Sequence, residues 1–171
     1  EFMTALLTSE RDNTDKVVEY VNEAERMGIE VLPPDVNASG GFFTVEDAQK
    51  KKIRFGLLAI KNVGRGAVES LVASRQEKGP FSSLEDLCQR IDLRLFNRKV
   101  LESIIKCGVL DGFKLPRAQM FASLDHILEC ASQTQRDKAS GQLSFFEQGF
   151  AENGFHRSQL ANIFHFHQQR F

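Results

Sequence analysis

The stretch "IKNVGRGAVESLVASR", residues 60–75, constrains the fold more than any other part of the chain. A short apolar segment ends there, two glycines and an arginine follow, and a helical pattern begins at about residue 66. A plain turn needs one glycine, and a phosphate-binding loop of the Gly-x-x-x-x-Gly-Lys-Ser type has a different spacing. The pattern therefore predicts two helices joined by a tight hairpin with an exposed backbone.

The two glycines point to a phosphate ligand. A helix N-terminus presents unpaired N–H groups and a partial positive charge, which bind phosphate if the backbone can come close. Gly64 and Gly66 carry no side chain to block that approach, and we expect Gly64 to take the positive φ that the hairpin needs. Asn62 also tolerates that conformation, and Lys61 and Arg65 add positive charge. The residues predicted to contact a nucleic-acid backbone here are Lys61, Asn62, Val63, Gly64, Arg65, Gly66 and Ala67. The alternative is a purely structural turn between two helices.

The net charge of −1 conceals a segregation of charge along the chain. Residues 1–49 carry three Lys/Arg and eleven Asp/Glu, whereas residues 50–117 carry fifteen and seven. A basic middle segment favours a local anionic partner. The alternative is that the basic and acidic segments pair with each other.

Helical spacing and stop signals divide most of the chain into short elements. Helices are expected after Asn13 or Thr14, over about 66–77, after Ser82 or Ser83, from Asn97 to Gly108, and from Pro116 onward. Alternating apolar residues predict a short strand at Ile29 and Val31, and two strands around a charged turn in "FFTVEDAQKKKIRFG". After about residue 132 a polar stretch reads as a linker.

"LFNRKVLESIIKCGVLDGF" has the pattern of a second, degenerate copy of the hairpin. Its turn, Asp92 to Asn97, lacks glycine, but Arg94, Arg98 and Lys99 can still reach phosphates. The alternative is a helix pair that only completes the core. The predicted fold is thus mainly α, a small helical domain with a tandem helix-hairpin-helix and a short β-hairpin.

Four long motifs extend this interpretation: "MGIEVLPPDVNAS", "IRFGLLAIKNVGRGAVESLVASR", "GPFSSLEDLCQRID" and "NRKVLESIIKCGVLDGF". In this order and spacing, the chain resembles the family of the bacterial DNA polymerase III alpha subunit over about residues 1–147. The resemblance implies the end of a fingers region, excised from a longer chain that binds primer-template duplex DNA. It implies four parts: fingers helices with a linking strand and turn (1–49), the tandem helix-hairpin-helix (50–115), a helix (116–135), and a linker with an unassigned tail (136–171).

The resemblance also implies a sliding-clamp contact in the tail. The family carries a Gln-x-x-Leu/Met-Phe peptide at this place, which here corresponds to Gln142, Leu143, Ser144, Phe145 and Phe146. The alternative is that these residues cover the core of this chain. His165 and His167 lack a third ligand in the tail, so we expect no metal site there.

Polymerase chemistry needs clustered carboxylates that hold magnesium, and no Asp-x-Asp occurs in this chain. The resemblance implies that magnesium binds in a palm region outside this sequence. We therefore expect no cofactor here, no activity of the isolated chain, and contacts with the remaining regions of the polymerase. Neither a signal segment nor a membrane span is evident, and Cys88, Cys107 and Cys130 are too few and too far apart for a disulfide framework. A cytoplasmic protein with reduced thiols is expected.

Overall fold

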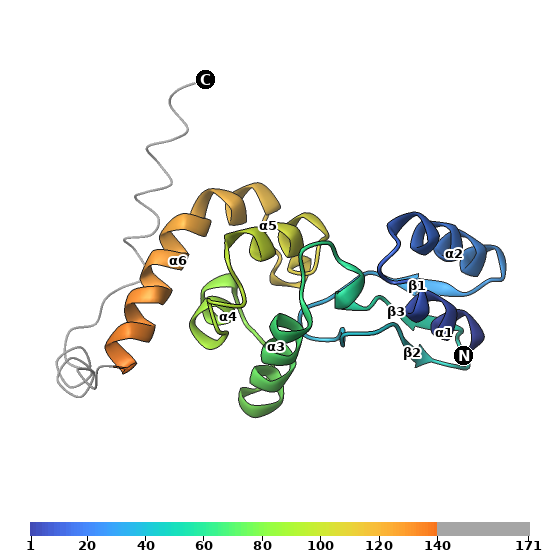
Figure 1. The fold of residues 1–171 in the computed structure, drawn as a ribbon, viewed down its shortest axis with the longest axis horizontal. Helices are drawn as coiled ribbons and strands as arrows, with labels where there is room; N and C mark the ends of the chain where they lie inside the picture. The colour runs from blue at the N-terminus through green and yellow to red at the C-terminus, as the bar shows by residue number, and fades with distance from the viewer. Residues whose placement is uncertain (140–171) are drawn as a thin grey trace, which may run out of the picture. The chain divides into compact units, whose positions relative to one another are not determined.

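The computed structural model describes residues 1–139 of the chain. Glu1–Ser132 form one compact unit, and a second unit begins at Gln133, inside the last helix. The fold of the first unit is mainly helical, as predicted (Figure 1). Its helices and strands are α1 (Phe2–Ser9), α2 (Thr14–Arg26), β1 (Glu30–Leu32), β2 (Thr44–Asp47), β3 (Lys52–Arg54), the 3-10 helix η1 (Leu57–Ala59), α3 (Arg65–Lys78), α4 (Leu84–Arg90), α5 (Arg98–Lys106), the 3-10 helix η2 (Asp111–Phe113) and α6 (Arg117–Ala139).

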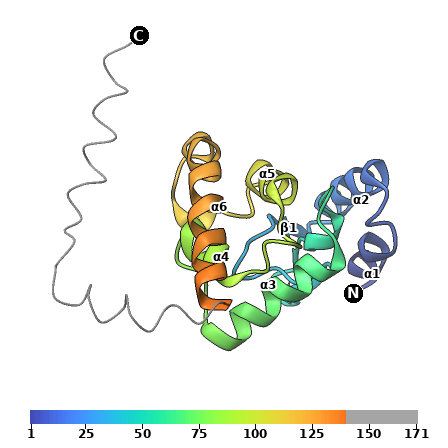
Figure 2. The same cartoon turned by 60° about the vertical axis from the view of Figure 1, so that its left-hand side comes forward.

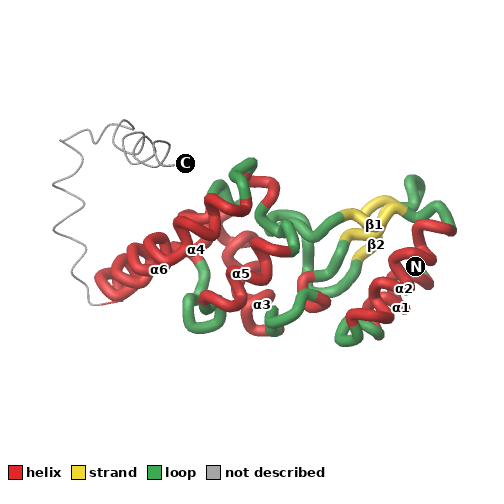
Figure 3. The backbone as a smooth tube through the Cα atoms, turned by 90° about the horizontal axis from the view of Figure 1, so that it is seen from above, coloured by secondary structure: helices red, strands yellow, loops and turns green. Residues whose placement is uncertain are grey.

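The three strands form one small sheet (Figure 3), and their order in it is β1-β3-β2. The expected hairpin is the antiparallel pair β2–β3, in which Val45 lies opposite Ile53. The β1 strand pairs in parallel with β3 on its other side, with Val31 opposite Ile53. Ile53 is therefore the central residue of the sheet, and it is buried.

Buried apolar residues form two clusters within the first unit. The smaller one joins α1 and α2 to the sheet through Met3, Leu7, Val17, Ala24, Phe43 and Ile53. The larger one joins α3, α4, α5 and α6 (Figure 2), and its fully buried members include Leu71, Leu84, Leu87, Phe96, Leu101, Ile104, Ile105, Met120 and Leu124. Phe55 packs against both clusters and so links the sheet to the helices.

Most helix ends follow the expected signals. The side chains of Asn13, Ser83 and Asn97 each accept a hydrogen bond from a backbone N–H of the first turn that follows. Gly28 and Gly108 take positive φ after α2 and α5. This conformation lets the backbone amides that follow each helix bond its last carbonyl groups, and glycine adopts it at no steric cost.

Two elements differ from expectation. The helix predicted before the first hairpin is only the single 3-10 turn η1, since Leu57–Ala59 is followed at once by the hairpin turn. The last helix continues to Ala139, into residues whose polar composition suggested a linker. Its Leu124, Ile127 and Ala131 are buried, at the spacing of one helix face.

None of the three cysteines, all of which lie in the described part of the chain, forms a disulfide. Cys88 is buried among the helices, and this burial raises the pKa of its thiol to about 12. Cys107 and Cys130 are exposed.

One glycine is required by the fold itself. A Cβ at Gly56 would lie 2.4 Å from the carbonyl carbon of Phe42 and 2.6 Å from the Phe43 nitrogen. The neighbouring amides of Leu57 and Leu58 donate to the carbonyls of Gly40 and Gly41, both at 2.9 Å. Two backbone segments therefore lie too close for any side chain at position 56.

We predict that Gly56→Ala destabilises the chain by about 1–3 kcal/mol or more, because rigid backbone must move to make room for the methyl group. Urea unfolding followed by circular dichroism measures this. Gly40→Ala is the matched control, since a Cβ at Gly40 meets nothing within 4 Å. Equal unfolding midpoints for the two variants would contradict the close packing described here.

Candidate nucleic-acid interface

The first hairpin is a four-residue turn. The Val63 N–H donates to the Ile60 carbonyl at 3.1 Å, and Asn62, the third residue of the turn, has φ +70°. A positive φ at this position is the signature of a type II turn, where glycine or asparagine is favoured. The side chains of Ile60 and Val63 are buried, while Lys61 and Asn62 between them are exposed.

The prediction that Gly64 takes the positive φ is wrong. Gly64 has φ −86° and ψ 161°, an extended conformation that any residue adopts. The turn closes earlier than expected, so the left-handed residue is Asn62, and Gly64 is the N-cap of α3.

The N-terminus of α3 is open. Gly64 has no side chain to accept a hydrogen bond, unlike the capping residues of α2, α4 and α5. Among the described residues, no acceptor is recorded for the backbone N–H groups of Arg65, Gly66 and Ala67. Together with the helix dipole, these donors suit an anion at this end of the helix.

The fold requires neither Gly64 nor Gly66. A Cβ at Gly64 would meet nothing within 4 Å, and a Cβ at Gly66 would reach Leu95 only at an ordinary 3.6 Å. Inside a helix, where Gly66 lies, glycine costs about 0.5–1 kcal/mol relative to alanine, whereas at an N-cap such as Gly64 it is better than alanine but slightly worse than asparagine. Packing therefore does not explain these two glycines, and without side chains there the backbone at the start of α3 stays open to close approach.

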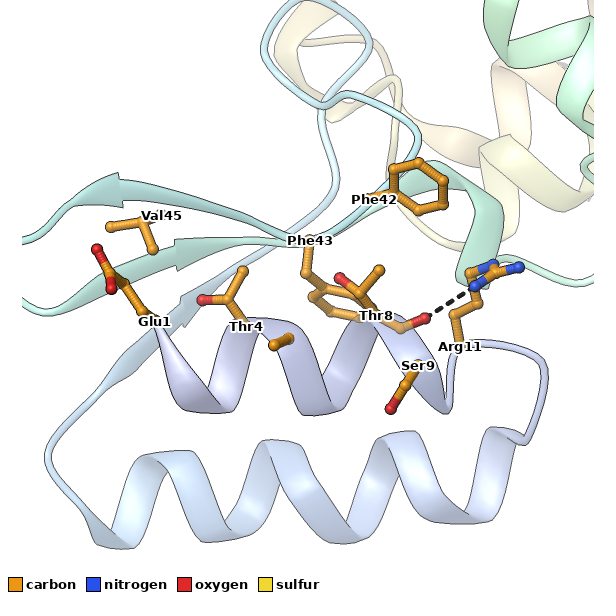
Figure 4. Close-up of a pocket in the computed structure, with 9 residues that line it drawn as sticks. Glu1, Thr4, Thr8, Ser9, Arg11, Phe42, Phe43 and Val45 are labelled. Carbon is orange, nitrogen blue, oxygen red and sulfur yellow. Dashed lines mark hydrogen bonds between the residues drawn. The ribbon is translucent and has the colours of Figure 1, made fainter.

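Two lysines at the interface carry free charge. Lys61 in the turn and Lys99 in the first turn of α5 are exposed, and the described residues give neither a carboxylate partner. Arg65 begins α3, but its side chain extends toward Phe42, with its guanidinium carbon 5.9 Å from the centre of the Phe42 ring. Arg11 approaches the same ring at 5.4 Å and donates to the Thr8 carbonyl, beside a hollow that α1 shares with Phe43 and Val45 (Figure 4).

The arginines of the second hairpin are largely neutralised. Both carboxylate oxygens of Asp92 accept from Arg94, with the shorter contact at 2.7 Å, and this pairing lowers the pKa of Asp92. Arg98 pairs with Glu102 at 2.8 Å and also with Asp125 of α6. Since Asn97 caps α5 as well, the second hairpin offers fewer free donors than the first.

The residues that join the two hairpins carry no signal in the local sequence. The Asn62 side-chain amide donates to the Ser103 hydroxyl at 3.0 Å, and Gly66 faces Leu95. Ser103 follows Lys99 by one helical turn, so the side of α5 that carries both residues faces the first hairpin. No local pattern marks a hydrogen bond between residues 41 positions apart.

The alternative, that acidic and basic segments pair with each other, holds at the sheet among the ion pairs of the described residues. Lys50, Lys52 and Arg54 form ion pairs with Asp47, Glu30 and Glu46 of the acidic segment. The Arg54 guanidinium lowers the pKa of Glu46 through their hydrogen bonds. Lys61 and Lys99 take no part in such pairs among the described residues, so positive charge remains at the hairpins.

A comparison with known families decides the assignment. The model of the helix-hairpin-helix motif matches residues 28–120, more than half of the chain. This chain belongs to the helix-hairpin-helix family. The match includes both hairpins and the sheet strand β3 that leads into the first of them.

The helix-hairpin-helix chain is similar to DNA polymerase III subunit alpha from several bacteria. It is 44% identical over 146 residues to the subunit of Haemophilus influenzae and also to that of Thermus aquaticus; each alignment covers 85% of this chain and 12% of the relative. The Pseudomonas aeruginosa subunit is 39% identical over 166 residues, which is 88% of this chain and 14% of the relative. The chain thus spans about an eighth of the length of these relatives.

Other predicted sites remain outside the structural description. Gln142, Leu143, Ser144, Phe145 and Phe146, the expected clamp-binding residues, lie beyond the described residues. Within residues 1–139, no group of three or more His, Cys, Asp or Glu side chains could hold a metal ion. None of the described helices has the length and apolar character needed to cross a bilayer.

We predict that Gly64→Asn preserves or raises stability but weakens binding to duplex DNA by at least about tenfold. The asparagine side chain can cap α3, which is worth a few tenths of a kcal/mol over glycine, but it then occupies one of the free amides, that of Gly66 or Ala67, and stands in the way of a phosphate. Gly64→Ala is the control that adds a Cβ without an acceptor. Fluorescence anisotropy with a labelled duplex and thermal unfolding of both variants separate the two effects, and unchanged affinity of Gly64→Asn would argue against phosphate at this helix end.

Proposed function

We propose that this chain binds the sugar–phosphate backbone of duplex DNA, without sequence preference, as the helix-hairpin-helix part of a replicative DNA polymerase. The observation that carries the proposal is the uncapped N-terminus of α3, where two glycines that the fold does not need leave three backbone amides free. Such donors suit phosphate oxygens and carry no information about base sequence.

The surrounding charge supports a polyanionic ligand. Lys61 stands next to the free amides, and the Asn62–Ser103 hydrogen bond ties this hairpin to the helix that carries Lys99. Positive groups on two separate elements suit a ligand that carries many phosphates. Hydrogen bonds to a phosphate are charge-assisted, and therefore stronger than those to a neutral acceptor.

The polymerase context rests on similarity. The relatives named above are similar over 85% of the chain and are polymerase subunits by name. Magnesium and the carboxylates that hold it would belong to a palm region elsewhere in such a polymerase, so this segment would hold DNA and leave catalysis to other parts. A cytoplasmic location follows from that role.

Two alternatives make different predictions. A helix-hairpin-helix repair protein without a polymerase would also bind duplex DNA, but similarity across 85% of this chain favours the polymerase. A purely structural helical domain would not bind DNA, and packing gives it no reason for Gly64 and Gly66.

We predict weak duplex binding whose affinity falls steeply with salt. Each neutralised phosphate contributes a slope of about −0.9 to log affinity against log salt concentration. Lys61→Ala should lower the magnitude of the slope by about one such increment. Lys78→Ala is the matched control, because Lys78 is exposed at the opposite end of α3.

Anisotropy titrations at several salt concentrations, with two duplexes of unrelated sequence, measure these slopes. Salt-independent binding, a strong preference for one duplex, or equal effects of the two lysine substitutions would each contradict backbone binding at the first hairpin.

We also propose that Gln142–Phe146 docks on a bacterial sliding clamp. The proposal rests on the family peptide that this segment resembles and on its adjacent aromatic pair. A short peptide binds well only if a few apolar anchors fill a pocket, since ordering its backbone is costly. Phe145 and Phe146 are the natural anchors, and Gln142 suits a hydrogen bond at the rim.

We predict that replacing Phe145 and Phe146 together by alanine abolishes clamp binding in a calorimetric titration. Gln142→Ala should weaken it by about 0.5–1.5 kcal/mol, the worth of one hydrogen bond. The double variant Phe150→Ala, Phe155→Ala removes two other phenylalanines of the tail and is the control. If the chain and both double variants bind alike, the segment is not a clamp peptide.

A further inference from the structure

The hydrogen bond between Asn62 and Ser103 connects two segments that are far apart in the chain. The Asn62 amide nitrogen lies 3.0 Å from the Ser103 hydroxyl oxygen. That hydroxyl donates in turn to the Lys99 carbonyl at 2.9 Å, one helical turn earlier in α5. The exposed turn of the first hairpin is therefore tied through two hydrogen bonds to the backbone of the helix that follows the second.

The backbone of the turn does not by itself call for asparagine. Asn62 has φ +70°, a conformation that glycine adopts more readily than any other residue. Asparagine tolerates it but gains nothing from it. The side chain at position 62 must therefore bring its own benefit, and its recorded contact in the structure is Ser103.

The bond is poorly suited to stabilising the core. Asn62 is exposed, and the core beneath the turn is already closed by buried Ile60 and Val63. What the bond does fix is the position of the turn along α5. Lys99 belongs to this same helix, so its position relative to the free amides of α3 depends on the same contact.

We propose that Asn62 and Ser103 form a bridge that holds the two hairpins at a fixed spacing, so that the α3 amides and Lys99 engage one duplex at the same time. The proposal rests on the function proposed above. Both residues are positioning residues, which act through the groups they hold. A duplex is stiff and its phosphates are regularly spaced, so a binding surface with fixed spacing does not have to be ordered when DNA binds.

The test is a double-mutant cycle with Ser103→Ala and Asn62→Gly, read by anisotropy with a labelled 20-base-pair duplex. Each single substitution should weaken binding by about three- to tenfold, the range expected for one lost hydrogen bond. The double variant should bind like either single variant, because both remove the same bridge. Fully additive losses, or unchanged affinity of Ser103→Ala, would overturn the proposal.

A second readout separates positioning from mere stability. The loss of duplex affinity caused by Lys99→Ala should be smaller in the Ser103→Ala background than in the unsubstituted chain. The magnitude of the salt slope should be lower in Ser103→Ala by up to about 0.9, the contribution of one phosphate contact. A structural role alone would lower the unfolding temperature and leave the salt slope unchanged. Ser103→Thr keeps the hydroxyl and should restore the slope.

Ser123→Ala is the matched control for the serine. The Ser123 hydroxyl donates to the carbonyl four residues earlier, that of Gln119, at 2.9 Å, as Ser103 does to Lys99, but it forms no recorded bond to a hairpin. Ser123→Ala should leave the affinity for the duplex and the salt slope of binding unchanged. If the unsubstituted chain fails to bind duplex DNA, the proposed function fails and the bridge loses its role with it. If the chain binds and only the cycle fails, the bridge alone is refuted.

Discussion

Burial of apolar side chains on both sides of an exposed turn is the constraint on which this molecule depends. Ile60 and Val63 enter the helical core, and Ala67 does the same from the first turn of α3. The turn between Ile60 and Val63 reverses the chain outside the core, so Lys61 and Asn62 are exposed. The amides at the start of α3 are thus held in place before any ligand arrives, and binding does not have to order them.

The glycines of the chain have two different physical reasons. Gly56 is confined by backbone on the neighbouring segment, so a side chain there is excluded by the fold. Gly64 and Gly66 have room for a side chain and take no unusual φ, yet they carry none. A glycine that the fold demands and one that it does not are indistinguishable in a sequence, and only the space around the Cβ separates them.

The parts of the fold that depend on near neighbours were predictable from sequence. Asn97 caps α5 and the stripe Val100, Leu101, Ile104 and Ile105 is buried, because capping and helical spacing act within a few residues. The positive φ was predicted at Gly64 but occurs at Asn62, because the sequence allows the turn to close at more than one position. The contact of Asn62 with Ser103 and the pairing of Arg98 with Asp125 depend on how helices pack, which local patterns do not encode.

The ion pairs at the sheet have a consequence for how a charged partner would first meet this molecule. Lys50, Lys52 and Arg54 are matched by carboxylates there, and the first 49 residues carry eleven acidic side chains against three basic ones. A polyanion approaching the α1–α2 side would be repelled, whereas the hairpin side would attract it. The charge distribution would therefore steer a diffusing polyanion, so that it meets the hairpin face more often than the α1–α2 face before any hydrogen bond forms.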